Sequence, residues 1–239
     1  MNDLFDPKFI AMLPIWWVAF LFSLTCHEAA HALVAKWGGD RTAHEAGQVS
    51  LSPIPHIRRE PFGTVIVPLV SYFLNQGGWM LGWASAPFNP IWAHRHPRRA
   101  AWMAAAGPAA NFCIAFIVGV ILSVGVLSGT FEAPSSVSFT RLAIGPDGAP
   151  TAATTLLSIL FTLNLLLGTF NLLPVPPLDG HAVVGLVLSD DNARRWSEFA
   201  RDPTFSILGL VLAWYGFGYI WNPVFSLALG LLYPWLSYG

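Results

Sequence analysis

Three residues in the first apolar run have the types and the spacing of a metal-dependent hydrolytic site. His27 and His31 are four residues apart. On a helix they therefore lie on one face, where two imidazoles can occupy two corners of a tetrahedral zinc site. Glu28 follows His27 directly, so its carboxylate can accept a proton from a water molecule beside the metal. We predict that His27 and His31 bind a metal and that Glu28 is the catalytic base.

The surroundings of this motif favour a functional over a structural role. It lies inside residues 9–37, an apolar run long enough to span about 30 Å of hydrocarbon. Ionisable groups are rare in hydrocarbon unless they pair, bind a metal or line a water-filled cavity. A single histidine could be a hydrogen-bonded core residue. That explanation does not account for two histidines at ligand spacing beside an acid.

The composition identifies the class of protein. Of 239 residues, 54% are hydrophobic and only 10% are charged, against about 25% charged in soluble domains. We expect a single integral membrane domain over residues 1–239 whose main partner is the lipid bilayer. The net charge is −1, and no basic patch with interleaved aromatic residues indicates nucleic acid. Cys26 and Cys113 each lie in an apolar run, which fits neither a disulfide framework nor a thiolate zinc site.

A third metal ligand is predicted far along the chain. Asp179 is the only acid between residues 149 and 188, and it ends the sequence N-L-L-P-V-P-P-L-D, residues 171–179. The three prolines cannot continue a helix, so the chain must unwind there. Irregular backbone at membrane depth is tolerated only beside protein or a water-filled cavity. We expect one Zn²⁺ per chain, held by His27, His31 and Asp179; a loop acid just outside the membrane is the alternative.

The fold class predicted from the apolar runs is an all-α polytopic membrane protein. We expect about five transmembrane helices, the last two forming a hairpin over residues 205–238 that turns at Asn222-Pro223. The expected spans are residues 9–37, 100–128, 151–173, 205–221 and 224–238. Residues 62–83 are interrupted by glycines and a proline, a poor composition for a lipid-facing helix, so we expect a re-entrant segment.

Two short strands are expected near the site. Residues 46–52 alternate polar and apolar side chains, as a half-buried strand does, and residues 83–88 form a second candidate. The first would offer an edge on which an extended substrate could pair. His56 follows it and could be a ligand, but an interfacial role is favoured, and it is left out of the metal set.

The basic residues predict the orientation in the membrane. If residues 62–83 spanned the bilayer, Arg58 and Arg98 would lie on opposite sides, against the tendency of basic loops to remain cytoplasmic. A re-entrant segment puts all of the twelve basic residues except Lys8 and Arg141 on the cytoplasmic side. The metal motif then lies toward the cytoplasmic face.

Three motifs together resemble the site-2 protease family of intramembrane zinc metalloproteases, peptidase family M50, in its small prokaryotic branch without a PDZ domain. They are H-E-A-A-H at 27–31, G-P-A-A-N at 107–111 and N-L-L-P-V-P-P-L-D-G at 171–180, and the likeness covers about residues 20–190. The resemblance implies that His27, His31 and Asp179 bind zinc, that Glu28 is the base, and that Asn171 handles substrate. Ser85 stands where many relatives have lysine.

The resemblance implies an endopeptidase of a prokaryotic cell membrane that cuts a transmembrane segment of another membrane protein. A catalytically silent metal-binding scaffold of the same fold is the alternative. A transporter is disfavoured because no further acids follow a path through the spans. Asn111 is expected to form an interhelical hydrogen bond, with a role in substrate or oxyanion binding as the other possibility.

Overall fold

The computed structural model describes residues 7–200 and 202–236, and most of them are helical. Four helices of the described chain are long and apolar enough to cross a membrane. They are α1 (Pro7–Gly38), α6 (Pro97–Leu127), α7 (Ala152–Asn171) and α10 (Pro203–Leu232). The shorter helices are α2 (Thr42–Glu45), α3 (Pro53–Arg59), η2 (Phe62–Ile66), α4 (Val67–Leu74), α5 (Pro90–Arg95), α8 (Asp179–Val183), η3 (Val184–Leu186) and α9 (Asp190–Phe199).

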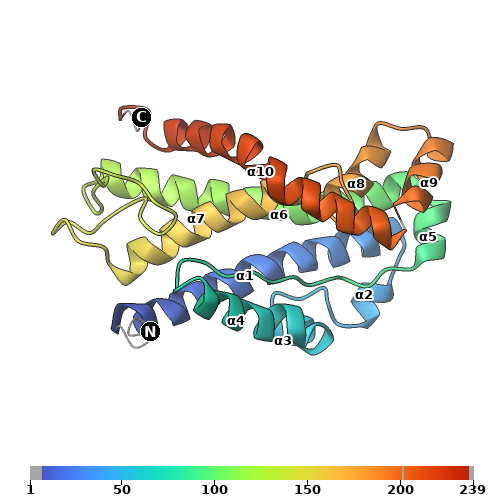
Figure 1. Cartoon of the computed structure of the whole chain (residues 1–239), viewed down its shortest axis with the longest axis horizontal. Coiled ribbons are helices and arrows are strands. Elements are labelled where there is room, and N and C mark those ends of the chain that lie inside the picture. Colours follow the sequence, from blue (N-terminus) through green and yellow to red (C-terminus); the bar gives the residue numbers. More distant parts are fainter. Residues whose placement is uncertain (1–6, 201, 237–239) are drawn as a thin grey trace.

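Helices α1, α6 and α7 pack against one another and form the centre of the molecule. The contact face of α6 carries small buried residues, among them Ala101, Ala104 and Gly107, which let neighbouring helices approach closely. The short helices α2, α5 and α9 gather at one end of the bundle, while the loop between α6 and α7 lies at the other (Figure 1). The first and third long helices therefore run in the same direction.

The apolar segment after α3 doubles back, while its entry into a membrane as a re-entrant segment stays a prediction. η2 and α4 lead to a turn in which Gln76 and Gly77 have φ angles of 52° and 78°, and residues 79–89 return extended to α5 (Figure 1). The two arms touch through their backbones, since Trp83 N donates to Gly63 O at 3.0 Å. A Cβ at Gly63 would collide with Trp83 O, and one at Gly82 with Gly63 O. Glycine at both positions permits this contact.

The strand predictions are wrong. Residues 46–52 form turns and bends that lead into α3. Ser52 caps that helix, its hydroxyl accepting from Ile54 N at 3.4 Å, and Pro53 occupies the first turn, where proline needs no hydrogen-bond donor. Residues 83–88 are extended but lack a neighbouring strand. In the part of the chain that the structure describes, β-pairing is limited to isolated bridges in the loop between α6 and α7.

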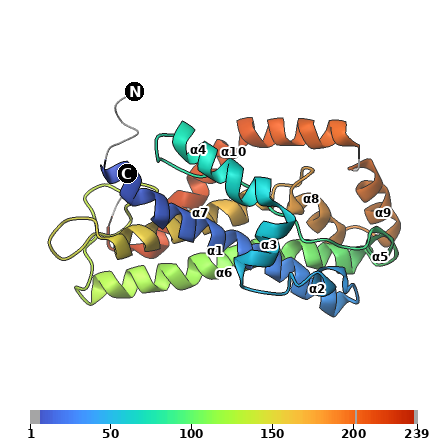
Figure 2. The same cartoon turned by 90° about the horizontal axis from the view of Figure 1, so that it is seen from below.

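The predicted C-terminal hairpin is also wrong, and residues 7–200 and 202–236 contain four candidate spans rather than about five. α10 continues through Asn222-Pro223 as one helix from Pro203 to Leu232. A proline inside a helix removes one hydrogen bond and bends the axis without requiring a reversal of the chain. Figure 2 shows α10 changing direction along its length.

Candidate metal and catalytic site

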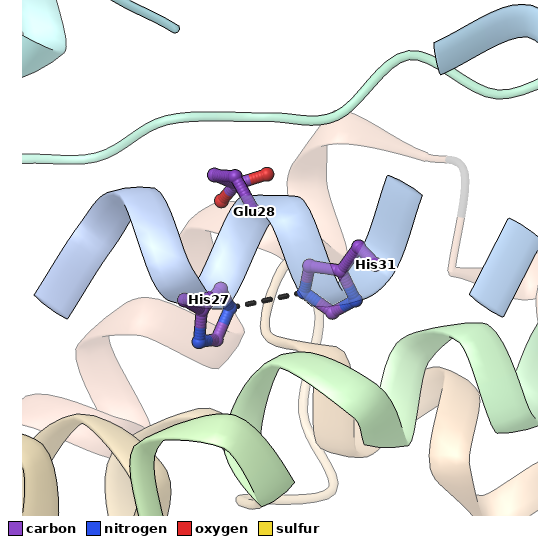
Figure 3. Close-up of side chains that lie close together, drawn as sticks. All are labelled: His27, Glu28 and His31. Carbon is purple, nitrogen blue, oxygen red and sulfur yellow. Dashed lines mark hydrogen bonds between the residues drawn. The ribbon is translucent and has the colours of Figure 1, made fainter. Parts of the chain in front are cut away.

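The motif of α1 is buried and brings its three functional groups together. His27, Glu28 and His31 are each less than 8% exposed, and their ligand atoms lie within 4.8 Å of one another. The two imidazoles share one face of the helix, with 3.0 Å between their Nε2 atoms (Figure 3). Glu28 projects from the adjacent face, toward the extended segment of residues 79–89 (Figure 3). The metal-binding and proton-accepting groups therefore stand side by side on different faces of one helix.

Asp179 lies beside the two histidines, while its role as the third metal ligand stays a prediction. It is the first residue of α8, and its Oδ2 lies 3.1 Å from His27 Nε2 and 3.2 Å from His31 Nε2. The glycine that follows makes this approach possible. A Cβ at Gly180 would collide with the backbone of Leu172 and Leu173, so glycine lets α8 begin tightly against the end of α7.

The donor and acceptor roles of the imidazoles fit a bound cation. His27 Nδ1 faces Asn111 Oδ1 at 2.6 Å, and His31 Nδ1 faces Met103 O at 2.7 Å. Both partners are acceptors, so each neutral ring carries its proton on Nδ1 and presents a lone pair at Nε2. The two Nε2 atoms and Asp179 Oδ2 then lie 3.0–3.2 Å from one another. Tetrahedral zinc with bonds of about 2.0–2.1 Å holds its ligands about 3.3 Å apart.

Two further observations support this fit. Asp179 Oδ2 is buried, yet it makes no hydrogen bond of suitable geometry despite its short distances to the imidazoles. In addition, a Cβ at Gly107 of α6 would collide with His31 Nε2. The G-P-A-A-N motif therefore supplies a glycine that keeps open the space in front of the imidazoles. Together these residues can hold a small cation beside the Glu28 carboxylate.

The two asparagines predicted near the site occupy different positions. Asn111 is fully buried behind His27 and forms the expected interhelical hydrogen bonds, to His27 and to Asn164. Asn171 is the last residue of α7 and is half-buried, and its amide donates to Leu167 O at 3.1 Å. A role for Asn171 in substrate binding stays a prediction.

Three other residues make structural hydrogen bonds. His56 is buried, and its Nε2 donates to Ser50 O at 3.1 Å. Ser85 donates to Glu60 Oε1 at 2.8 Å, which ties the extended segment to the end of α3. His181 lies on α8, where its carbonyl accepts from Trp196 Nε1 of α9 at 2.7 Å.

Two residues of the site were not predicted. Asn164 and Ser23 are both fully buried, and Asn164 Nδ2 donates to Ser23 Oγ at 2.8 Å. The available signal was an amide side chain in the middle of the uncharged residues 151–173, which is costly there unless it is hydrogen-bonded. That signal predicts that the Asn164 amide is hydrogen-bonded, but it does not identify the residue to which it is bonded.

The comparisons with known proteins agree with this geometry. The sequence model of peptidase family M50 matches residues 15–214. A relative from Bacillus subtilis (strain 168), named "Putative zinc metalloprotease YwhC", is 35% identical over 180 residues, which cover 73% of this chain and 69% of the relative. No solved structure matches the chain significantly. The family match covers α1 from residue 15 onward and all of α6, α7 and α8, so every residue of the candidate site lies inside it. The chain therefore belongs to peptidase family M50 and is a zinc metalloprotease.

Proposed function

We propose that this zinc metalloprotease hydrolyses a peptide bond within or near a transmembrane segment of another membrane protein. His27, His31 and Asp179 would hold one zinc ion, and Glu28 would act on the attacking water. One observation carries the proposal. Three acceptor atoms converge beside a buried glutamate, and the helix that supplies two of them is long and apolar enough to span a membrane.

The chemistry assigned to Glu28 follows from its position. Zinc, when bound, supplies a Lewis acid that polarises the substrate carbonyl and makes a water molecule easier to deprotonate. Glu28 Oε2 is buried and has no hydrogen-bond partner among the described residues, so it is available to accept the proton of that water. The same carboxyl group can then donate the proton to the leaving amine. Glu28 is thus the catalytic residue of the proposal.

The extended residues 79–89 are the best candidate for guiding the substrate. A helical segment hides its carbonyls in internal hydrogen bonds, so a transmembrane substrate must unwind before it can be cut. The edge expected at residues 46–52 is absent. Residues 79–89 instead run past α1 on the side from which Glu28 projects (Figure 3). An unwound substrate could pair with this segment and present its backbone to the carboxylate.

The distribution of charge supports a site near the cytoplasmic face of a prokaryotic cell membrane. Basic residues of α5, α6 and α9 lie at the end of the bundle where those helices meet (Figure 1). Basic segments tend to remain cytoplasmic. The metal motif lies in the last third of α1, toward the same end.

Replacement of Glu28 by glutamine tests the proposal. Glu28→Gln removes the proton acceptor and leaves the three metal-binding side chains in place. We expect the purified variant to retain one zinc per chain, whereas Asp179→Ala should lose it. In membranes of cells that produce each variant, terminal-peptide mass spectrometry should find a membrane protein cut by wild type and left intact by Glu28→Gln. Such a base contributes about 10²- to 10⁴-fold to the rate.

Glu132→Gln is the matched control, since Glu132 is an exposed residue of the loop between α6 and α7 and should leave cleavage unchanged. If wild type and Glu28→Gln left the same membrane proteins intact, the protease proposal would fail. The metal-binding scaffold would then be preferred.

A further inference from the structure

We propose that Asn164 and Ser23 are positioning residues for the metal site. Together with Asn111 they form a buried hydrogen-bond chain that fixes the His27 imidazole with its proton on Nδ1, which leaves Nε2 free for zinc. The inference rests on the proposed metal site, but it concerns side chains of α1, α6 and α7 that do not touch the metal position themselves.

The hydrogen-bond chain begins at two backbone carbonyls, Ala19 O and Leu160 O, which can only accept hydrogen bonds. Ser23 Oγ donates its single proton to Ala19 O at 2.7 Å. The hydroxyl can therefore meet Asn164 only as an acceptor, and Asn164 Nδ2 donates to it at 2.8 Å. The second proton of Asn164 Nδ2 goes to Leu160 O, also at 2.8 Å. These two acceptors fix which end of the Asn164 amide is nitrogen.

The orientation of the Asn164 amide then determines the orientation of the Asn111 amide and, through it, which nitrogen of His27 carries the proton. Asn164 must present Oδ1 to its neighbour, so Asn111 donates to it through Nδ2, at 2.8 Å. The same Nδ2 lies 3.5 Å from Ser23 O, a second acceptor. Asn111 therefore turns its own Oδ1 toward His27, where the distance to Nδ1 is 2.6 Å. An amide oxygen only accepts, so the proton of a neutral His27 ring must be on Nδ1.

Because these side chains are buried, neither amide can adopt the flipped orientation without losing hydrogen bonds. Ser23, Asn111 and Asn164 all have 0% exposure, so water cannot replace a lost partner. A flipped amide anywhere in the chain would put donor against donor or acceptor against acceptor, which is unfavourable in a buried site. His31 reaches the same state more directly, because its Nδ1 faces the Met103 carbonyl. Partners of this kind commonly orient metal-binding histidines and raise their affinity.

Replacement of Asn164 should release the amide of Asn111. In Asn164→Leu, only the longer contact with Ser23 O, at 3.5 Å, still favours an Asn111 Nδ2 that points away from His27. A flipped Asn111 would donate to His27 Nδ1 and shift the ring proton to Nε2, the atom that must bind zinc. We expect zinc affinity, measured by chelator competition on the full-length protein in nanodiscs, to fall about 10- to 100-fold.

The tautomer provides the readout that a purely structural role would not change. In metal-free protein at pH 8, ¹⁵N-histidine NMR should show His27 protonated on Nδ1 in wild type and partly on Nε2 in Asn164→Leu. Thr162→Val is the matched control. Thr162 is 1% exposed on the same helix, and its hydroxyl donates to Ser158 O at 2.9 Å. The control should keep both the wild-type affinity for zinc and the wild-type tautomer.

Ser23→Ala provides a second, milder test that does not depend on Asn164→Leu folding. It removes one of the two acceptors that orient Asn164 and leaves Leu160 O in place, so the loss of affinity should be smaller. If Asn164→Leu and Ser23→Ala both bound zinc like wild type and kept His27 protonated on Nδ1, the inference would be wrong. Failure of the proposed metal site has a different signature, namely zinc retained in Asp179→Ala. The tautomer of metal-free His27 tests the chain of hydrogen bonds in either case.

Discussion

Gly107 contributes to the site by having no side chain. A Cβ at this position would collide with His31 Nε2, so we expect Gly107→Ala to displace an imidazole and abolish stoichiometric zinc binding. Alanine is favoured over glycine inside a helix by about 1 kcal/mol, so α6 itself should not be weakened. Metal analysis together with a melting curve of the purified variant would test this.

Gly218→Ala serves as the control for Gly107→Ala. Gly218 also lies inside a helix, and a Cβ there meets nothing within 4 Å. This variant should bind zinc normally. A Gly107→Ala protein with one tightly bound zinc would show that the space in front of the imidazoles is not needed.

At the level of single residues, sequence reasoning finds groups whose chemistry is unusual for their surroundings. His27, Glu28 and His31 stand out through their spacing in an apolar run, and Asp179 stands out as a lone acid after three prolines. Asn164 carries no such pattern. Its role depends on the packing of α7 against α1 and α6, which brings it within 2.8 Å of both Ser23 Oγ and Asn111 Nδ2. Contacts of this kind follow from tertiary structure and leave little trace in one sequence.

Among the elements, the junction after α1 holds the extended residues 79–89 in place. Asp40 Oδ1 accepts from the backbone and the hydroxyl of Thr42, at 3.0 and 2.6 Å, and Oδ2 accepts from Asn89 N at 2.7 Å. Burial raises the pKa of the Asp40 carboxyl, but these three hydrogen bonds outweigh it and hold the pKa below its usual value. Asp40 therefore joins the end of α1 to the end of the returning arm.

The lowered pKa of Asp40 predicts how stability depends on pH. A carboxyl group whose pKa is lower in the folded state stabilises the protein above its unfolded pKa, about 3.9, and loses that contribution as pH falls through the folded value. Asp40→Ala should lower the free energy of unfolding at pH 7 by about 1–3 kcal/mol. The difference from wild type should shrink below about pH 4, as measured by thermal unfolding in detergent at a series of pH values.

Asp147→Ala is the comparison for Asp40→Ala, because Asp147 is an exposed residue of the loop between α6 and α7. It should unfold like wild type at pH 7. Equal stability of Asp40→Ala and wild type at pH 7 would contradict the role given to Asp40.

Two of the wrong predictions lie at prolines. The strand predicted at residues 46–52 is followed by Pro53 and Pro55, which lie at the start of α3 behind the capping Ser52. Pro223 was interpreted as the turn of a hairpin, but it lies inside α10. Proline is compatible with the start of a helix and with a bend in one. Which of these occurs depends on neighbouring elements that the local pattern does not reveal.

For the molecule as a whole, α10 is more than an added membrane anchor. It packs on the proline-containing loop before Asp179, where Leu173, Leu178 and Ala213 form a small apolar cluster. The approach is close, because a Cβ at Gly209 would collide with Pro176 O. Residues of α10, which follow the three motifs in the sequence, therefore support the loop that places Asp179.

The outer surface of the bundle suits a lipid environment. Large apolar side chains are exposed along α6 and α10, including Phe116, Trp214 and Tyr219. Charged side chains instead gather at the end where α5 and α9 lie, and some form ion pairs there, such as Arg98 with Asp190 at 3.6 Å between Nε and Oδ1. This separation of apolar sides from a charged end is expected of a protein that crosses a bilayer.

The path of the re-entrant segment leads to a prediction about topology. Arg58 on α3 and Arg98 on α6 are both exposed, and the segment between them doubles back rather than continuing across the bundle (Figure 1). Single cysteines at these positions, in a chain whose Cys26 and Cys113 are replaced by alanine, can be labelled with a membrane-impermeant maleimide. We expect Arg58→Cys and Arg98→Cys to react only from the cytoplasmic face, in inverted membrane vesicles. Ser135→Cys, in the loop between α6 and α7, should react only from the opposite face.

Labelling of Arg58→Cys and Arg98→Cys from opposite faces would mean that residues 62–89 cross the bilayer. The basic residues would then be divided between the two sides, and the argument for a cytoplasmic site would be lost. The placement of Asp179 beside the histidines would also be contradicted, because one more crossing between α1 and α7 would make these two helices run in opposite directions. Labelling of both cysteines from the cytoplasmic face would instead place His27, His31 and Asp179 near the cytoplasm, where the proposed cut within a substrate helix would release its cytoplasmic part.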